Sequence, residues 1–236
     1  MMTFNISGFT HTGTERTLNE DRILLNGQIL EEGFLHLSEQ SFCSCFVADG
    51  VGGNNAGEFA AHFILEAINK FEYSCADALK NHLKTINTEL IKHSSKDKNL
   101  MGSASTLSGL IINDNEISVV HAGDSEVWLL RNDLLLKVTN DHVLNPYENN
   151  SPITSYFGGH SEHLVFDKRV NLDDSECNDI FLICSDGLFK SVGVKMVKSI
   201  LKANKMLHEK SEKILENALL LGAIDNLSAI IVERTI

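Results

Sequence analysis

The stretches Phe46-Val47-Ala48-Asp49-Gly50 and Phe181-Leu182-Ile183-Cys184-Ser185-Asp186-Gly187 end in the same way. Each is a short apolar run, with the length and composition of a buried β-strand, that stops at an aspartate and a glycine. One such run predicts an ordinary turn, because Asp-Gly is a strong turn signal. Two of them suggest that both carboxylates point into one site, since a carboxylate at the end of a buried strand is costly unless cations pair with it.

The composition is that of a globular protein. The 236 residues suit one large domain or two small ones, and an apolar fraction of 43% supports a sizeable core. No internal boundary or repeat is visible, so we expect a single domain over residues 1–236. The formal net charge is −12, from 20 basic and 32 acidic side chains without a basic stripe, which argues against nucleic acid as a partner.

Nothing in the sequence predicts export or a membrane span. No apolar run reaches the roughly 18 residues of a membrane helix, and the start of the chain lacks the basic and apolar segments of a signal peptide. The cysteines are odd in number and show no CxxC spacing. We therefore expect reduced thiols in a cytoplasmic protein rather than disulfides or a zinc site.

Hydrophobic periodicity predicts an α+β fold with largely antiparallel strands. Apolar runs predict strands at 4–10, 22–25, 41–49, 105–112, 116–122, 126–131, 134–138, 163–171, 179–185 and 227–233. Apolar residues spaced by three or four predict helices near 59–71, 75–92, 194–203 and 208–221. The three strands between 105 and 131, joined by turns at 113–115 and 123–125, favour a meander. We place residues 26–41 in a loop or hairpin.

The segment 139–162 has a different character. It holds both prolines of the chain, Pro146 and Pro152, with many Asn, Ser, Gly and His residues and no strong periodicity. A loop of this length in a compact domain is usually functional or mobile.

Six acidic residues form the candidate site. Each stands at a strand end or tight turn beside a small or polar residue: Glu20, Asp21, Asp49, Asp124, Asp186 and Asp225. Clustered carboxylates repel one another and are tolerated through protonation or through bound cations. Magnesium and manganese prefer oxygen ligands, and a pair of such ions can activate a water and bind a phosphoryl group. The alternative for each aspartate alone is an ordinary turn or cap residue.

Arg16 precedes Asp21 by five residues. Its guanidinium could bind a phosphate through two parallel hydrogen bonds, or it could form a surface salt bridge with Glu15 or Glu20. The sequence contains no GxSxG, HExxH or GxxxxGK[ST] motif, which argues against a serine hydrolase, a zinc protease and a P-loop enzyme. We expect His121 to be a packed or hydrogen-bonded histidine rather than a metal ligand.

Taken in order, these residues resemble the motifs of the metal-dependent protein phosphatases, the type 2C serine/threonine family. The matching segments, in chain order and over almost the whole chain, are Arg16–Asp21 (R-x-x-N-E-D), Phe46–Gly53 (V-x-D-G-x-G-G) followed by Ala56-Gly57-Glu58, Gly102–Leu107 (G-x-G-T-T-L), Ala122–Ser125 (G-D-S-R), Thr139–His142 (T-x-D-H), Cys184–Leu188 (S-D-G-L) and Asp225–Ser228 (D-N-x-[TS]). Any one motif is weak, but seven in order are a strong signal.

The resemblance implies a four-layer α-β-β-α sandwich with two central, mostly antiparallel sheets and metal ions between the sheets at one edge. It implies that Asp49 bridges two ions of manganese or magnesium. Asp186 and Asp225 bind one ion in this arrangement, and the carbonyl of Gly50 binds the other.

The resemblance also assigns the remaining candidates. Glu20 and Asp21 act mainly through metal-bound waters, and Arg16 holds the substrate phosphate. Asp124 matches a ligand of a third, weaker ion in bacterial members. The segment 139–162 falls where the family carries its flap.

Three positions depart from the family pattern. Val51 stands where many eukaryotic members have a histidine proposed as general acid, and Glu126 replaces the arginine of G-D-S-R. Residues 102–105 match loosely. None of these changes removes a metal ligand, so the resemblance implies an active enzyme that hydrolyses phosphoserine and phosphothreonine on proteins by a water bridging two metal ions.

The compact length and Val51 favour a bacterial-type phosphatase. We expect a cytoplasmic monomer without nucleic-acid or membrane partners. Its phosphoprotein substrates would be produced by a cognate Ser/Thr kinase. Two alternatives stay open: a phosphatase-like module that binds phosphoproteins or regulates without turnover, and a phosphatase dedicated to one regulatory protein.

Overall fold

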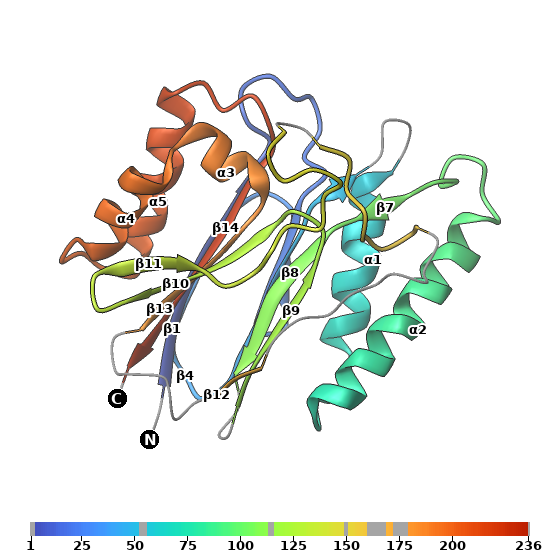
Figure 1. The fold of residues 1–236 in the computed structure, drawn as a ribbon, viewed down its shortest axis with the longest axis horizontal. Coiled ribbons are helices and arrows are strands. Elements are labelled where there is room, and N and C mark those ends of the chain that lie inside the picture. Colours follow the sequence, from blue (N-terminus) through green and yellow to red (C-terminus); the bar gives the residue numbers. More distant parts are fainter. Residues whose placement is uncertain are drawn as a thin grey trace.

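Two six-stranded sheets lie face to face in the computed structural model, and helices cover both outer faces (Figure 1). The structure describes residues 3–51, 56–112, 116–148, 151–159, 169–171 and 179–235. Every strand pairing among these residues is antiparallel. The expected α+β sandwich of four layers is confirmed.

The first sheet joins the two ends of the described chain. Its strands, in order across the sheet, are β11 (Leu134–Lys137), β10 (Glu126–Arg131), β13 (Ile180–Cys184), β14 (Leu227–Thr235), β1 (Thr3–His11) and β4 (Gly33–Gln40). β14 pairs with β1 along its whole length and with β13 on its other side. The second apolar run of the sequence, β13, is therefore an interior strand of this sheet.

The second sheet contains the first apolar run. Its strands, in order, are β12 (Arg169–Asn171), β9 (Glu116–Ala122), β8 (Leu107–Ile112), β5 (Cys43–Ala48), β2 (Arg22–Leu25) and β3 (Gln28–Leu30). A short pair, β6 (Gly50–Val51) with β7 (Ala104–Ser105), continues beyond β5. β5 is thus an interior strand that leads directly into Asp49.

The space between the two sheets is an apolar core. Val47 of β5 and Phe181 and Ile183 of β13 are buried in it. Alternate residues of the same strands, such as Phe46 and Leu182, are buried on the opposite faces, beneath the helices. Because successive side chains of a strand point to opposite faces, a strand buried on both sides is apolar throughout. This explains the continuous apolar runs that mark both strands in the sequence.

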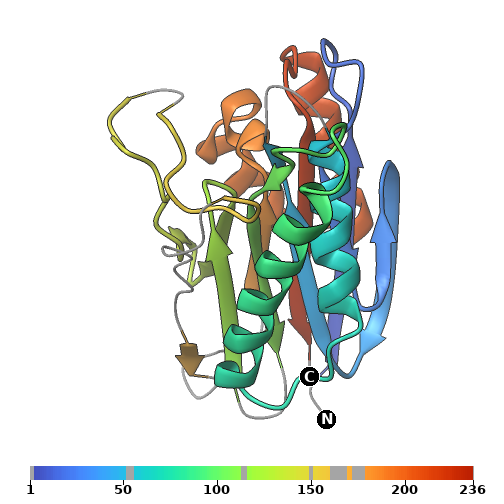
Figure 2. The ribbon, with the colours of Figure 1, turned by 90° about the vertical axis from the view of Figure 1, so that its right-hand side faces the viewer.

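The helices form the two outer layers (Figures 1 and 2). α1 (Gly57–Asn69) and α2 (Ala76–Ser94) cover the second sheet, whereas α3 (Asp186–Ser191), α4 (Val194–Lys202) and α5 (Leu207–Leu220) cover the first. α1 buries Ala60, Ile64 and Ile68 against the sheet. Among the described residues, no helix is both long and apolar enough to cross a membrane.

The predicted meander is wrong. β8 and β9 form a hairpin in the second sheet, but β10 pairs with β11 and β13 in the first sheet. Residues 123–125 therefore cross from one sheet to the other. The same division applies to residues 26–41, where β3 belongs to the second sheet and β4 to the first, so these residues do not form a hairpin.

Two further predictions need adjustment. The short helix α3, which begins at Asp186, was not expected from the sequence. Of the strand predicted at 163–171, the structure describes only Arg169–Asn171, as β12, and residues 163–168 lie outside the described part.

The described parts of the segment 139–162 are residues 139–148 and 151–159. They contain isolated bridges rather than helices or longer strands, one of which pairs Phe157 with Ser105. Figure 2 shows the segment projecting from one end of the sheets. The amide of His142 donates to the carbonyl of Gly123 at 2.8 Å, which attaches the segment to the crossover between the sheets.

Candidate metal centre

The two strand-Asp-Gly stretches bring their aspartates together. Asp49 follows β5 directly, and Asp186 begins α3 just after β13. Burial raises the pKa of Asp49 well above its ordinary value, and the nearby charges of Asp21, Asp186, Asp124 and Asp225 raise it further. These carboxylates come from both sheets and from three loops. They lie near enough to one another to disfavour ionisation of Asp49.

The backbone of Asp49 is held by β7 and the residue that follows it. The amide of Thr106 and the hydroxyl of Ser105 donate to the Asp49 carbonyl at 2.8 and 2.9 Å. The Asp49 amide in turn donates to the Thr106 hydroxyl oxygen at 3.2 Å. Because these bonds satisfy both backbone groups of Asp49, they fix where its side chain begins.

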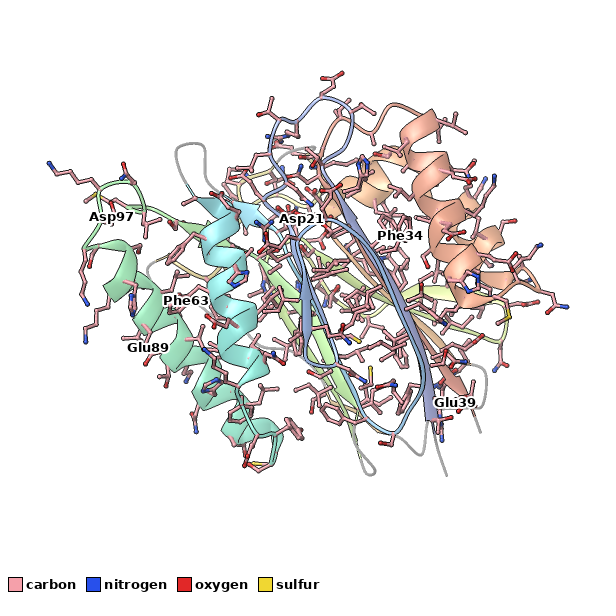
Figure 3. The ribbon with its side chains drawn as sticks, turned by 180° about the vertical axis from the view of Figure 1, so that it is seen from behind. Asp21, Phe34, Glu39, Phe63, Glu89 and Asp97 are labelled. Atoms are coloured by element: carbon pink, nitrogen blue, oxygen red, sulfur yellow. The ribbon has the colours of Figure 1, made fainter. Side chains whose placement is uncertain are left out.

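Asp21 is fully buried, and only one of its carboxylate oxygens has a partner among the residues that the structure describes. Its Oδ2 atom accepts from the hydroxyl of Ser185 at 2.9 Å, and the Ser185 oxygen accepts from the amide of Ser228 at 3.0 Å. Burial raises the pKa of Asp21 to about 7, against the opposing effect of these two serines. Figure 3 shows Asp21 toward the upper end of the sheets, whereas the chain ends lie at the lower end in Figure 1.

Asn226 ties the loop after β1 to the start of β14. Its side-chain oxygen accepts from the amide of Glu20 at 3.0 Å, and its side-chain amide donates to the carbonyls of Thr12 and Leu18 at 2.8 and 3.0 Å. This network fixes the loop that carries Glu20 beside Asp225.

Glu20 packs against Gly50 and Gly57, whose backbones lie close together. A Cβ atom on Gly50 would lie 2.5 Å from the backbone of Gly57, and one on Gly57 would lie 2.7 Å from the Glu20 carboxylate. Side chains at these two positions would therefore displace Glu20. Burial raises the pKa of Glu20, and the charge of Glu58 raises it further.

Asp124 lies on the crossover between the sheets, and not in the two-strand turn that the sequence suggested. Gly123 has a φ of +118°, and a Cβ there would lie 2.6 Å from Thr106. The Thr106 hydroxyl also shares a 2.7 Å hydrogen bond with Ser125. Thr106 therefore links the Asp124 crossover to the backbone of Asp49. Burial and the charge of Asp186 raise the pKa of Asp124 to about 7, whereas Lys190 lowers it.

In the described part of the chain, two basic side chains contact these carboxylates. The guanidinium of Arg16 lies 2.8 Å from Asp225 Oδ1. The ammonium of Lys190 contacts Asp186 Oδ2 and lies 3.9 Å from Asp225 Oδ2.

The donor set fits magnesium or manganese better than zinc. It consists of carboxylate and carbonyl oxygens, which hard cations prefer. In the part of the chain that the structure describes, no three Asp, Glu, His or Cys side chains form a ready-made metal cage. Ions at this site would therefore be bound by few carboxylates each and would keep several waters, as magnesium commonly does. The buried Asp21 Oδ1, without a partner, is the kind of atom that such an ion or its water satisfies.

A protein-family model confirms the resemblance seen in the sequence. The model for protein phosphatase 2C matches residues 18–219. The chain belongs to this family. Among curated relatives, serine/threonine phosphatase stp of Listeria innocua is 26% identical over 251 residues, spanning 96% of this chain and 94% of the relative. Protein phosphatase PhpP of Streptococcus pneumoniae is 24% identical and covers 96% of both chains.

Two solved structures show the same fold. PppA, a key regulatory component of T6SS in Pseudomonas aeruginosa, superposes with a TM-score of 0.80 at 24% identity, covering 99% of this chain and 100% of PppA. The catalytic domain of serine/threonine phosphatase PstP, solved with two manganese ions, superposes with a TM-score of 0.82 at 22% identity and covers 100% of both chains.

The structure places two positions that depart from the phosphatase 2C motifs, and it also places His121. Val51, in β6, offers no proton donor in place of a histidine. The Glu126 carboxylate binds Lys137 at 2.5 Å and the indole of Trp128 at 2.6 Å. His121 is fully buried and bonded to the Ser108 hydroxyl and the Asn140 carbonyl, both at 2.8 Å, as expected for a packed histidine.

The sequence reasoning missed Lys190 as a phosphatase-site residue. The contact between Lys190 and Asp186 could have been predicted, because a lysine four residues after Asp186 lies on the same face of any helix that starts there. It also missed the roles of Ser105 and Thr106, which lie in the loosely matching segment. Their bonds to Asp49 depend on the pairing of β6 with β7, which has no local sequence signal.

Proposed function

We propose that this protein is a metal-dependent phosphatase that removes phosphate from phosphoserine and phosphothreonine on proteins. Membership of the phosphatase 2C family supports the reaction class. The observation that carries the proposal for this chain is the convergence of Asp21, Asp124, Asp186 and Asp225 around Asp49, with one buried carboxylate oxygen left without a partner.

The proposed ligand roles follow the motifs. Asp49 would bridge two ions of manganese or magnesium. Asp186 and Asp225 would bind one ion, and the Gly50 carbonyl the other. Glu20 and Asp21 would act through waters. When bound, the two ions supply an activated water and stabilise negative charge on the phosphoryl oxygens. A third, weaker ion at Asp124 is a further hypothesis from the resemblance.

The chain's own residues prepare the reaction. Ser185, which itself accepts from Ser228, holds the Asp21 carboxylate, and Ser105 and Thr106 hold the backbone of Asp49, so less reorganisation of these residues is needed. Arg16 is 52% exposed in its side chain and belongs to a loop that Asn226 fixes beside Asp225. Its guanidinium can turn from Asp225 to a phosphoryl group and bind two of its oxygens.

The cellular setting is also a proposal. We place the protein in the cytoplasm as a single-domain monomer over residues 1–236, acting on phosphoproteins made by a cognate Ser/Thr kinase. Residues 139–162 would act as the flap beside the centre, because their described part is attached at Gly123 and Ser105.

Phosphate release in the presence and absence of metal tests the function. The purified protein, assayed with p-nitrophenyl phosphate and with a phosphothreonine peptide, should be active with manganese and inactive with excess EDTA. Activity should return when manganese or magnesium is added back beyond the EDTA. Full activity in EDTA would contradict the metal mechanism. Tight peptide binding without turnover in manganese would favour the binding-module alternative.

A further inference from the structure

Lys190 lies close to two acidic residues of the candidate metal centre. α3 begins at Asp186, and Lys190 follows one helical turn later, on the same face. Its ammonium contacts Asp186 Oδ2 and lies 3.9 Å from Oδ2 of Asp225, which precedes β14. One side chain thus connects two carboxylates that enter the centre from different elements.

Lys190 also acts on Asp124, which lies on the crossover between the sheets. The positive charge of Lys190 acts on Asp124, and the charges of Asp186, Asp225 and Asp124 act on Lys190. The ammonium therefore lies within electrostatic range of three acidic residues.

An ordinary helix salt bridge looks different. Glu66 of α1 and Lys70, the residue that follows this helix, are also four residues apart, with their charged atoms 2.8 Å from each other. The side chains of Lys70 and Glu66 are 70% and 50% exposed, and the ammonium of Lys70 bonds to Glu66. Such exposed pairs contribute little to stability. Lys190 differs because its neighbours belong to three separate parts of the chain that meet at Asp49.

We propose that the ammonium of Lys190 takes the place of a third metal ion among Asp124, Asp186 and Asp225. The protein then binds two divalent ions and not three. The inference rests on the proposed two-ion phosphatase. It changes the expectation for Asp124, whose charge is countered by a side chain that belongs to the protein.

The physical reason is competition for the same oxygens. A divalent ion placed beside Asp124 and Asp186 would lose the Asp186 oxygen that Lys190 occupies and would be repelled by the ammonium. Without Lys190, the repulsion among Asp124, Asp186 and Asp225 would be less well compensated, and binding of an additional metal ion would be favoured. Lys190 thereby acts as a positioning and charge-balancing residue, without contact to the reacting atoms.

Manganese counting tests this directly. Wild type, Lys190→Gln, Lys190→Arg and the double variant Lys190→Gln/Asp124→Asn are dialysed to equilibrium against manganese up to the millimolar range, and bound metal is counted by mass spectrometry. We expect two ions in wild type and in Lys190→Arg, three in Lys190→Gln, and two again in the double variant. Lys70→Gln is the matched control and should bind two.

Thermal melting gives a second readout that does not depend on activity. In EDTA, Lys190→Gln should melt below wild type, because Asp186 loses its ion pair and Asp124 loses a nearby positive charge. Manganese should raise its melting temperature by more than it raises that of wild type. If Lys190→Gln unfolds, Lys190→Met is used for the ion count in its place. Anomalous diffraction from manganese-soaked wild-type crystals then counts the ions in wild type.

The outcomes separate the two proposals. Three ions in wild type, or equal ion counts in wild type and Lys190→Gln, would overturn the role of Lys190 while leaving the phosphatase intact. No manganese bound to any variant would overturn the metal centre itself, and with it both proposals.

Discussion

The guanidinium of Arg16 lies 2.8 Å from Oδ1 of Asp225. The residue proposed to hold the substrate phosphate therefore contacts a residue proposed to bind metal. Neither salt bridge that the sequence left open for Arg16, with Glu15 or with Glu20, is the one found. A metal ion on Asp225 would compete with Arg16 for the carboxylate and leave the guanidinium available to an anion.

This contact predicts how Arg16→Ala behaves. The variant should raise the KM for phosphate esters by about 10- to 100-fold, because it removes a charged hydrogen-bond donor worth about 1.5–3 kcal/mol. The kcat should fall less. Because Asp225 also loses a competing cation, the manganese concentration for half-maximal activity should not rise. Steady-state kinetics over substrate and manganese measure both effects.

Arg16→Lys provides the control for this prediction. A lysine keeps the charge but cannot bind phosphate in the two-pronged way of a guanidinium. Its KM should lie between those of wild type and Arg16→Ala. An unchanged KM in Arg16→Ala would remove Arg16 from the substrate site.

Asp49→Asn should separate stability from activity. The pKa of Asp49 is raised by burial and by its acidic neighbours, so its charge is unfavourable in the metal-free protein. A neutral asparagine should therefore raise the melting temperature in EDTA and reduce the stabilisation by manganese. The kcat/KM should fall by roughly 10³-fold, equivalent to several kcal/mol of transition-state stabilisation.

The comparison variant for Asp49→Asn is Arg16→Ala. Loss of a residue that holds both ions should reduce kcat/KM more than loss of a residue that positions phosphate. The proposed bridging role fails if Asp49→Asn retains more activity than Arg16→Ala.

Much of the fold could be predicted from local pattern alone. The strands at 22–25, 116–122 and 126–131 have the bounds that periodicity indicated, because buried strands need uninterrupted or alternating apolar residues. The pairing of those strands could not be predicted in the same way. Residues 123–125 have the composition of a hairpin turn, yet they cross between sheets, since turn chemistry is the same for both connections.

In the candidate site, too, some residues have a local sequence signal and others do not. Asp49 and Asp186 were recognisable because a carboxylate that ends a buried apolar strand needs a partner. Thr106 was not, because its bonds to Asp49 and Ser125 join residues far apart in the chain. The roles of the acidic residues as metal ligands stay predictions.

The absence of a proton donor at Val51 predicts a strong dependence on the leaving group. An aryl phosphate leaves as a stabilised phenolate and needs little protonation, whereas an alkyl phosphate such as phosphoserine needs an acid. The kcat for aryl esters should therefore exceed that for alkyl esters by about 10²-fold or more when chemistry limits the rate.

A histidine at this position tests the same point. Val51→His should raise turnover of alkyl phosphates more than that of p-nitrophenyl phosphate. Equal turnover of both ester types by wild type, with chemistry rate-limiting, would point to another acid in the site.

His121 predicts the acid sensitivity of the fold. Burial and the charge of His142 lower the pKa of His121 from 6.5 to about 4. As pH falls below 6.5, the unfolded chain takes up this proton before the folded protein does. His121 therefore reduces stability progressively between pH 6.5 and 4, by about 3 kcal/mol at the lower end.

The difference between wild type and His121→Gln isolates this effect. Asp21 and Asp124, whose pKa values are raised to about 7, act in the opposite direction, because the folded protein binds their protons first. They are present in both proteins and cancel in the comparison. Melting temperatures in EDTA should show His121→Gln less stable than wild type at pH 7 and gaining on it as the pH falls. A His121→Gln difference that is independent of pH would mean that His121 titrates normally in the folded protein.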